Sequence, residues 1–324
     1  MPTLQSDSLL RFSRLLVVAL AILHGAAALA EGWPRTIAHD GGSLTLDAPP
    51  VRIVSTSPSL TGTLLAIDAP VVSTAAAVQG PLTDASGFFR QWADIARARG
   101  LDVLYPNLSF DIEALIVADP DLVIVSETGG DSALAFVPEI EALGFPVLVL
   151  NYGVNSWEQL ATTLGQATGH EDDAAAIIAA FAERAAEARA RARIPDQEGT
   201  ASIVSYNFFG TYGISKPEGV QARVLADMGF TVTGVPEGMQ GMIQQSREFD
   251  FLSHENLPAA VTGDTVFLLA ADETDVRAFL NDPVLANLPA VRSGRVYPLG
   301  KTSFRIDYYS GLAMIDAVEA EFAH

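Results

Sequence analysis

The amino-acid sequence predicts an α/β protein with two lobes, each built on a mostly parallel β-sheet, and one long rigid helix that joins them. Short apolar runs alternate with amphipathic stretches from residue 52 to residue 150, and the same alternation restarts at residue 201. Between the two parts lies an alanine-rich segment, residues 170–193, which breaks the rhythm. Strands that alternate with helices are typical of parallel sheets covered by helices.

In the first lobe, apolar and β-branched runs predict buried strands, and the stretches between them predict helices. The expected strands are residues 52–57, 71–73, 121–126 and 146–150. The expected helices start at Pro58-Ser59 and cover residues 112–118 and 134–143.

The alanine-rich segment predicts one continuous helix. Acidic residues stand at its start and arginines at its end, which complements the helix dipole, and alanine has the highest helix propensity. At about 1.5 Å per residue it would span roughly 35 Å. Pro195 and Gly199 would end it. Because one rigid helix resists hinge opening, we expect little motion between the lobes.

The second lobe repeats the pattern of the first. Its expected strands are residues 201–206, 230–232, 265–270 and 295–299, and its expected helices are residues 222–228 and 309–322. The predicted organisation is a signal peptide (1–30), an N-terminal lobe (31–168), the bridging helix (169–195) and a C-terminal lobe (196–324).

The first thirty residues have the three parts of a secretory signal. Arg11 and Arg14 form a positive region, residues 15–23 are apolar, and Ala28-Leu29-Ala30 has the small-x-small form of a cleavage site. The apolar run is short for a membrane span. We therefore expect export, cleavage after Ala30, and a location in a Gram-negative periplasm with no membrane insertion.

Composition excludes several functions. The formal net charge is -20, and removal of Arg11, Arg14 and Asp7 with the leader takes away a net +1 and leaves about -21. Such acidity argues against nucleic-acid binding. The chain has no cysteine nucleophile and no Gly-x-Ser-x-Gly motif, so it predicts no enzyme. The histidines after the leader are scattered (His39, His170, His254 and His324), so no metal site of its own is expected.

Two clusters of arginine and aromatic residues stand out in this acidic chain. Arg90 lies close to Trp92 in the first lobe, and Arg305 lies close to Tyr308 in the second. The pair predicts two halves of one site for a flat, anionic, aromatic ligand. The alternatives are arginines paired with nearby acids, Asp94 or Asp307, and a Trp92 that belongs to the core.

Further candidates follow strands of the second lobe. Tyr206 and Phe209 come at the end of the first strand, where ligands of open α/β sheets bind. Core packing is the alternative for both. Arg247 is a possible third cation, and a solvated loop charge is its alternative.

Several strings carry a family resemblance. Residues 50–55, 57–70, 118–124, 129–135, 288–297 and 304–310 resemble the periplasmic binding proteins of iron-siderophore and cobalamin ABC importers, and within them the ferric-enterobactin type. The resemblance covers nearly the whole chain after the leader. It implies two lobes bridged by one helix, a shallow cleft between them, and delivery of the ligand to an inner-membrane ABC permease.

The resemblance also suggests the ligand chemistry. A ferric tris-catecholate carries about three negative charges, and its iron is already coordinated, so the receptor needs cations and flat apolar faces but no cofactor. Arginine supplies a permanent charge and a planar group that stacks on rings. Cobalamin or haem is the alternative ligand, and a sensor or interaction domain without a ligand is the alternative of another class.

Family members present one acid per lobe to the permease. Glu255 fits the position in the second lobe, and Asp131 is the candidate in the first. Glu139 or Glu141 could take the place of Asp131, whose other reading is a helix N-cap.

Overall fold

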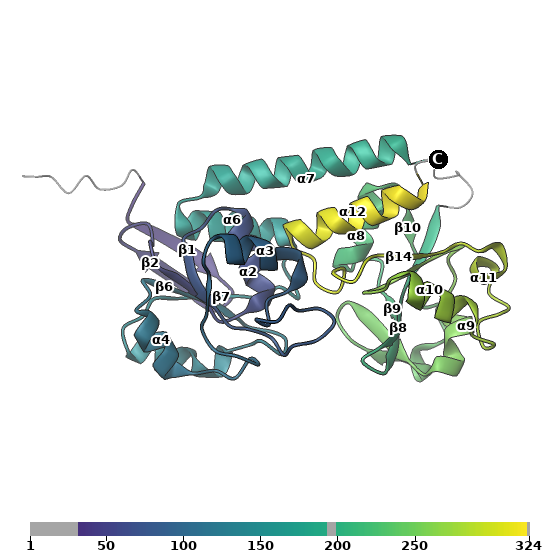
Figure 1. Cartoon of the computed structure of the whole chain (residues 1–324), viewed down its shortest axis with the longest axis horizontal. Coiled ribbons are helices and arrows are strands. Elements are labelled where there is room, and N and C mark those ends of the chain that lie inside the picture. Colours follow the sequence, from purple (N-terminus) through teal and green to yellow (C-terminus); the bar gives the residue numbers. More distant parts are fainter. Residues whose placement is uncertain (1–31, 193–198, 323–324) are drawn as a thin grey trace, which may run out of the picture.

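The computed structural model describes residues 32–192 and 199–322. Two lobes lie side by side beneath one long helix (Figure 1). The predicted signal peptide, residues 1–30, lies outside the described residues, as do residues 193–198, where Pro195 was expected to end the long helix. Within the described ranges, no helix is long and apolar enough to cross a membrane.

The first lobe is built on a wholly parallel five-stranded sheet in the order β5-β4-β3-β6-β7. Its strands are β3 (Ile53–Ser55), β4 (Val71–Thr74), β5 (Asp102–Val103), β6 (Leu122–Ser126) and β7 (Val147–Leu150). Every residue of β3, β6 and β7 is buried, as expected for a sheet covered on both faces. The strand order reverses between β3 and β6, and ligands of open α/β sheets bind beyond such a reversal.

Helices and one hairpin complete the first lobe. The helices are α2 (Pro58–Ala66), α3 (Arg90–Ala98), α4 (Ile112–Ala118), α5 (Val137–Ala142) and α6 (Trp157–Thr168), with the short 3₁₀ turn η1 (Leu134–Phe136). The hairpin β1 (Arg35–His39) and β2 (Gly42–Leu46) forms a separate two-stranded sheet. Its contribution to the core is Ile37 and Leu46.

The long helix α7 (Glu171–Arg191) runs over both lobes (Figure 1). Three acids lie in its first turn and two arginines in its last, so the expected dipole complement is present. Phe181 packs on Trp157 of α6 with ring centroids 4.9 Å apart. Gly311 lets the last helix approach closely, because a Cβ at that position would lie 2.6 Å from Phe181.

The second lobe has a seven-stranded sheet in the order β11-β12-β9-β8-β13-β14, with β10 beside β8. Its strands are β8 (Thr200–Phe208), β9 (Thr211–Ser215), β10 (Thr231–Val232), β11 (Gln244–Gln245), β12 (Phe249–Leu252), β13 (Thr265–Leu268) and β14 (Val296–Pro298). Strands β8, β10, β13 and β14 run parallel, whereas β9, β11 and β12 pair antiparallel. The sheet is therefore mixed, because the β8–β9 hairpin reverses the chain.

The helices of the second lobe are α8 (Val220–Asp227), α9 (Leu257–Ala260), α10 (Glu273–Leu280), α11 (Pro289–Ser293) and α12 (Tyr308–Phe322), with the 3₁₀ turns η2 (Gln240–Met242) and η3 (His254–Asn256). Helix α12 lies beside α7 and also contacts α2 and α3 of the first lobe. One hydrophobic cluster runs from Ile53 through α7 to Phe267. The predicted fold class is confirmed, and the continuous core favours the expected rigidity between the lobes.

Candidate ligand-binding site

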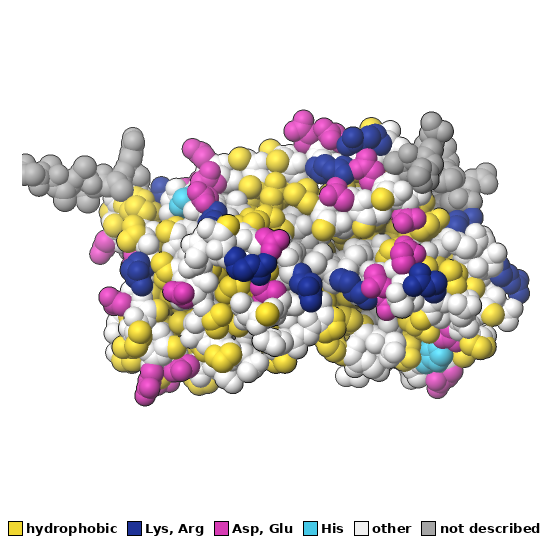
Figure 2. Space-filling view, in the orientation of Figure 1, with side chains coloured by type: hydrophobic (Ala, Val, Ile, Leu, Met, Phe, Trp, Pro, Cys, Tyr) yellow, Lys and Arg dark blue, Asp and Glu magenta, His cyan; other side chains and the backbone are white. Residues whose placement is uncertain are grey.

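A pocket of about 450 Å³ opens between the two lobes. The first lobe contributes residues that follow the carboxyl ends of β6 and β7, and the second lobe contributes residues from β8, β9 and β12 and from the segment after β14. Figure 2 shows that the surface is hollowed at the lower edge between the lobes, with hydrophobic side chains at that place. The volume lies within the range of small-molecule sites.

Arg305 is the central cation of this pocket. Its guanidinium carbon lies 4.3 Å from the ring centre of Phe304 and 5.0 Å from that of Tyr152, which comes from the other lobe. Its Nε is buried and has no hydrogen-bond partner, and Arg305 forms no ion pair with any described residue. Asp307, the acid expected as its alternative partner, is bonded to Ser310 instead. Arg305 is therefore held by rings, and its guanidinium group makes no hydrogen bond to the described residues.

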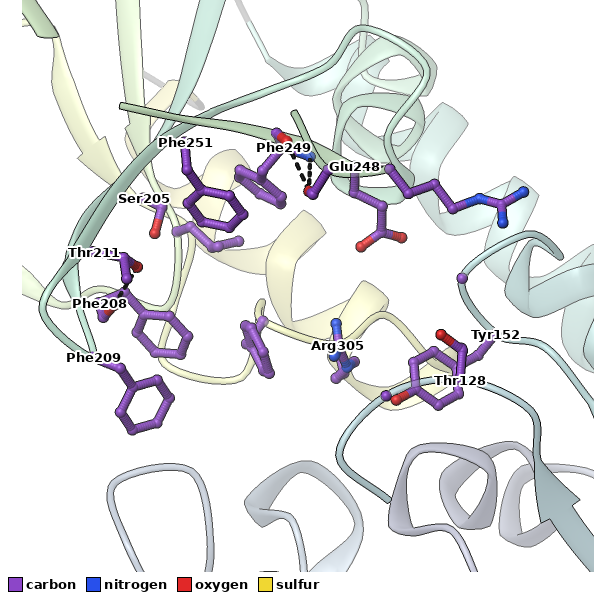
Figure 3. Close-up of a pocket in the computed structure, with 16 residues that line it drawn as sticks. Thr128, Tyr152, Ser205, Phe208, Phe209, Thr211, Glu248, Phe249, Phe251 and Arg305 are labelled. Atoms are coloured by element: carbon purple, nitrogen blue, oxygen red, sulfur yellow. Dashed lines mark hydrogen bonds between the residues drawn. The ribbon is translucent and has the colours of Figure 1, made fainter. Parts of the chain in front are cut away.

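Aromatic side chains form the walls. They are Tyr152, Phe208, Phe209, Phe249, Phe251 and Phe304. Phe208 lies 4.8 Å from Phe304 and 4.5 Å from Phe209, centroid to centroid. Phe249 and Phe251 lie on one face of β12, two residues apart, with their rings stacked at 6.3 Å. Figure 3 shows the labelled rings of this set around an open space beside Arg305. The pocket can thus hold flat aromatic groups and negative charge together.

Phe209 stands at the tip of the β8–β9 hairpin. Its side chain is 74% exposed and its φ is +51°, a left-handed conformation that is rare for a bulky residue. A large apolar ring displayed to solvent at the mouth of a pocket is suited to contact with a ligand.

Asp131 fixes the position of the Tyr152 side chain. Its hydroxyl donates a hydrogen bond of 2.7 Å to Asp131 Oδ1, and the other carboxyl oxygen accepts from Ser57 Oγ at 2.6 Å and from the Ser59 N–H at 3.2 Å. Burial raises the pKa of the Tyr152 hydroxyl, and the charge of Asp131 raises it further. Tyr152 is therefore a neutral donor. The Ser59 bond also caps the first turn of α2, so Asp131 joins β3, β6 and β7 at the point where the strand order reverses.

Gly129 makes this arrangement possible. Its φ is +88°, and a Cβ built there would lie 1.6 Å from the Tyr152 hydroxyl. Only glycine fits both the conformation and the contact.

Two more charged residues line the pocket. Arg247 is exposed and has no hydrogen bond or ion pair with the described residues. Glu248 is half-buried, and burial raises the pKa of its carboxyl group while the charges of Arg305, Arg247 and Arg223 lower it.

The predicted site residues divide into three sets. Arg305, Arg247 and Phe209 line the main pocket. Tyr206 lines a smaller neighbouring pocket of about 190 Å³, on the other side of Phe208 and Phe209, and its hydroxyl donates to Asp282 at 2.7 Å. The remaining three candidates, Arg90, Trp92 and Tyr308, do not line the main pocket.

Trp92 is a core residue, contrary to its assignment as a ligand contact. Its side chain is fully buried among Phe88, Phe89 and neighbouring apolar groups, because α3 turns it inward against α2. Tyr308 packs on Trp157 at 5.9 Å, at the edge of the main core. Arg90 is exposed, and its Nε donates to the Pro81 carbonyl at 2.9 Å. Its other expected partner, Asp94, pairs with Arg97 instead.

The two predicted docking acids differ in accessibility. Glu255 is exposed on η3. Hydrogen bonds from its own backbone N–H and from Ser253 lower its pKa, so it is charged at neutral pH. Asp131 is 8% exposed and bonded as described above, so it cannot reach a partner protein. Asp131 does cap a helix, but that helix is α2 and not the segment that directly follows Asp131. Glu139 and Glu141, the alternatives in the first lobe, are exposed.

Among the lining residues that sequence reasoning missed are Tyr152, Glu248, Phe249 and Phe251. Tyr152 lies two residues after the end of a predicted strand, a signal like the one that led to Tyr206, and could have been found. Phe249 and Phe251 belong to the short antiparallel strand β12, and Glu248 directly precedes it, in a segment that lacked a clear pattern. Within the described ranges, no three histidine, cysteine or acidic side chains are grouped to hold a metal ion.

The comparisons with known proteins settle the family. Residues 53–302 match the model of the periplasmic binding protein family. The chain belongs to the periplasmic binding proteins. This membership confirms the prediction of a binding protein and not an enzyme.

Individual relatives are consistent with the match. The chain is 41% identical to the ferric enterobactin-binding periplasmic protein FepB of Escherichia coli over 311 residues, which cover 95% of this chain and 97% of FepB. The structure of holo-ViuP superimposes with a TM-score of 0.81 and 36% identity, over 90% of this chain and 96% of ViuP. The catecholate-siderophore binding protein VctP of Vibrio cholerae has a TM-score of 0.64 at 16% identity, covering 88% and 99% of the two chains, and shows the shared fold.

Proposed function

We propose that this protein captures a ferric catecholate siderophore of the enterobactin type in the periplasm and delivers it to an inner-membrane ABC permease. The observation that carries the proposal is Arg305, a cation with a buried, unpartnered Nε held between aromatic rings of both lobes. The 41% identity to FepB over nearly the whole chain supports the same ligand class.

The pocket chemistry suits such a complex. A ferric tris-catecholate presents negative oxygens around the metal and aromatic rings outside them. Arg305 and Arg247 supply permanent positive charge, and the phenylalanines supply flat faces. The iron arrives fully coordinated, so it needs no ligand from this chain.

Fluorescence tests this proposal. Trp157 lines a small pocket that adjoins the main one and shares Arg305 and Tyr152 with it. A coloured ferric complex bound in the main pocket should therefore quench the fluorescence of Trp157. We expect saturable quenching with ferric enterobactin and none with cobalamin or haem. Quenching by cobalamin or haem alone would replace the proposed ligand, and quenching by none of the three would favour a sensor or interaction domain.

For delivery, we propose that Glu255 contacts the permease from the second lobe and that Glu139 or Glu141 does so from the first. All three are exposed acids near the ends of short helices. Exposed carboxylates meet arginines of a partner at small desolvation cost.

A further inference from the structure

Glu248 is an acid in a pocket whose other charged lining residues are arginines. It lines both the main pocket and the small pocket that adjoins it, where Arg305 is also present. In Figure 3 its carboxylate points into the main pocket, toward the space beside Arg305 and Tyr152. It is half-buried and has no side-chain hydrogen bond or ion pair with the described residues. A carboxylate in such a place would repel the anion that the arginines attract.

Three arginines and one tyrosine are the titratable groups around Glu248. Arg305 comes from the segment after β14, Arg247 is its neighbour in the chain, and Arg223 comes from α8. From the facing lobe comes Tyr152, whose raised pKa keeps it neutral.

Lys216 does not neutralise the carboxylate of Glu248, because its ammonium group has other partners. The Lys216 N–H bonds to the Glu248 carbonyl at 2.8 Å, whereas its ammonium group donates to the Ser246 carbonyl and lies 3.6 Å from Asp250. The lining of the main pocket thus carries two positive charges and one negative charge while Glu248 is ionised, a net charge of +1.

We propose that Glu248 takes up one proton from solvent when an anionic ferric complex enters the pocket, so that it couples affinity to the negative charge of the ligand. The proposal rests on the proposed function. The proton adds to a carboxylate oxygen, no other bond changes, and the lining then carries a net charge of +2. A neutral ligand would leave the carboxylate charged.

Burial already disfavours the ionised form of the Glu248 carboxyl group, and ligand entry buries this group further. The complex displaces water from Glu248 and adds negative charge close to it, and both effects raise the pKa of the carboxyl group above its value in the empty pocket. Affinity is then highest at low pH, falls as pH rises through the interval between the two pKa values, and becomes constant above it. One unit of difference corresponds to about a tenfold change in affinity.

Calorimetry in two buffers of different ionisation enthalpy, phosphate and Tris, counts the protons exchanged. We expect ferric enterobactin to bind the wild type with net proton uptake at neutral pH. Glu248→Gln should bind about tenfold more tightly and lose that uptake, because glutamine resembles the protonated acid. Glu237→Gln, which changes an exposed acid outside the pockets, should behave as the wild type does. Protonation of the ligand itself would appear equally in all three proteins.

Equal proton uptake by the wild type and Glu248→Gln would overturn the proposal. Absence of proton uptake by the wild type would also overturn it, and this result does not depend on the behaviour of any variant. Weaker binding by Glu248→Gln would also contradict it and would make Glu248 a direct contact. No binding of ferric enterobactin to the wild type or to Glu237→Gln would instead refute the proposed function on which it rests.

Discussion

The guanidinium of Arg305 in the second lobe lies 5.0 Å from the ring centre of Tyr152 in the first. This contact spans the cleft, so both lobes define the position of one cation. Asp131 accepts a hydrogen bond of 2.7 Å from the Tyr152 hydroxyl, at the strand reversal of the first sheet. Tyr152 and Asp131 together form the platform on which the Arg305 guanidinium packs.

Gly129→Ala should disrupt the platform. A Cβ would lie 1.6 Å from the Tyr152 hydroxyl, at a φ of +88°, so the ring must move or the loop must refold. We expect a loss of unfolding free energy of about 1–3 kcal/mol and weaker ligand binding. Gly130→Ala is the matched control, since nothing lies within 4 Å of its Cβ. Urea denaturation checks the pair, and equal stability of the two variants would contradict the steric account.

Tyr152→Phe should separate stability from binding. It removes one of three donors to a buried carboxylate and should cost about 1–3 kcal/mol of unfolding free energy. The ring beneath Arg305 remains, so affinity should change little. Tyr212→Phe, which removes a hydroxyl with no hydrogen bond to the described residues, should leave stability nearly unchanged. A large loss of affinity in Tyr152→Phe would show that the hydroxyl itself contacts the ligand.

Asp307→Asn should reduce the pH dependence of stability. Burial raises the pKa of the Asp307 carboxyl group above its ordinary value, and its hydrogen bonds from Ser310 and Gln91 oppose this only in part. A raised folded-state pKa means that the folded protein binds more protons than the unfolded chain in that interval, so stability falls as pH rises through it. As pH rises above the ordinary titration range of a carboxyl group, melting temperatures should fall less in the variant. An identical pH profile would contradict the assignment.

Glu255→Gln should leave ligand affinity unchanged and reduce uptake in cells. The side chain is exposed on η3, outside the pockets. Glu273→Gln, an exposed acid on α10, serves as the control. Uptake equal to that of the wild type would remove Glu255 from the docking surface.

Low motion between the lobes stays a prediction. The core that continues through α7 supports it, and solution scattering with and without ligand would measure it. A change of several ångströms in the radius of gyration would contradict it.

Much of the fold could be predicted from local patterns. The alanine-rich segment became α7 within two residues at each end, because its propensity and charge distribution point the same way. The central parallel strands followed from continuous apolar runs. The antiparallel strands β9 and β12 were missed, since they are short and their pairing depends on contacts distant in sequence.

Site residues that follow a clearly patterned strand could be predicted from the sequence. Residues whose role depends on whether the side chain is buried could not. Arg305 follows β14 and was identified. Trp92 and Asp131 could not be placed, because a tryptophan in an amphipathic helix and an acid after glycines acquire their roles only in the folded chain. Asp131 bonds to Ser57, 74 residues away, so no local pattern reveals that contact.

The central claim is that Arg305 and its aromatic neighbours hold a ferric catecholate. Calorimetric titration of ferric enterobactin into Arg305→Ala tests it most directly, with Arg292→Ala, an exposed arginine on α11, as the control. We expect the control to bind as the wild type does and Arg305→Ala to lose about 1–3 kcal/mol of binding free energy. Equal affinity of all three proteins would contradict the claim.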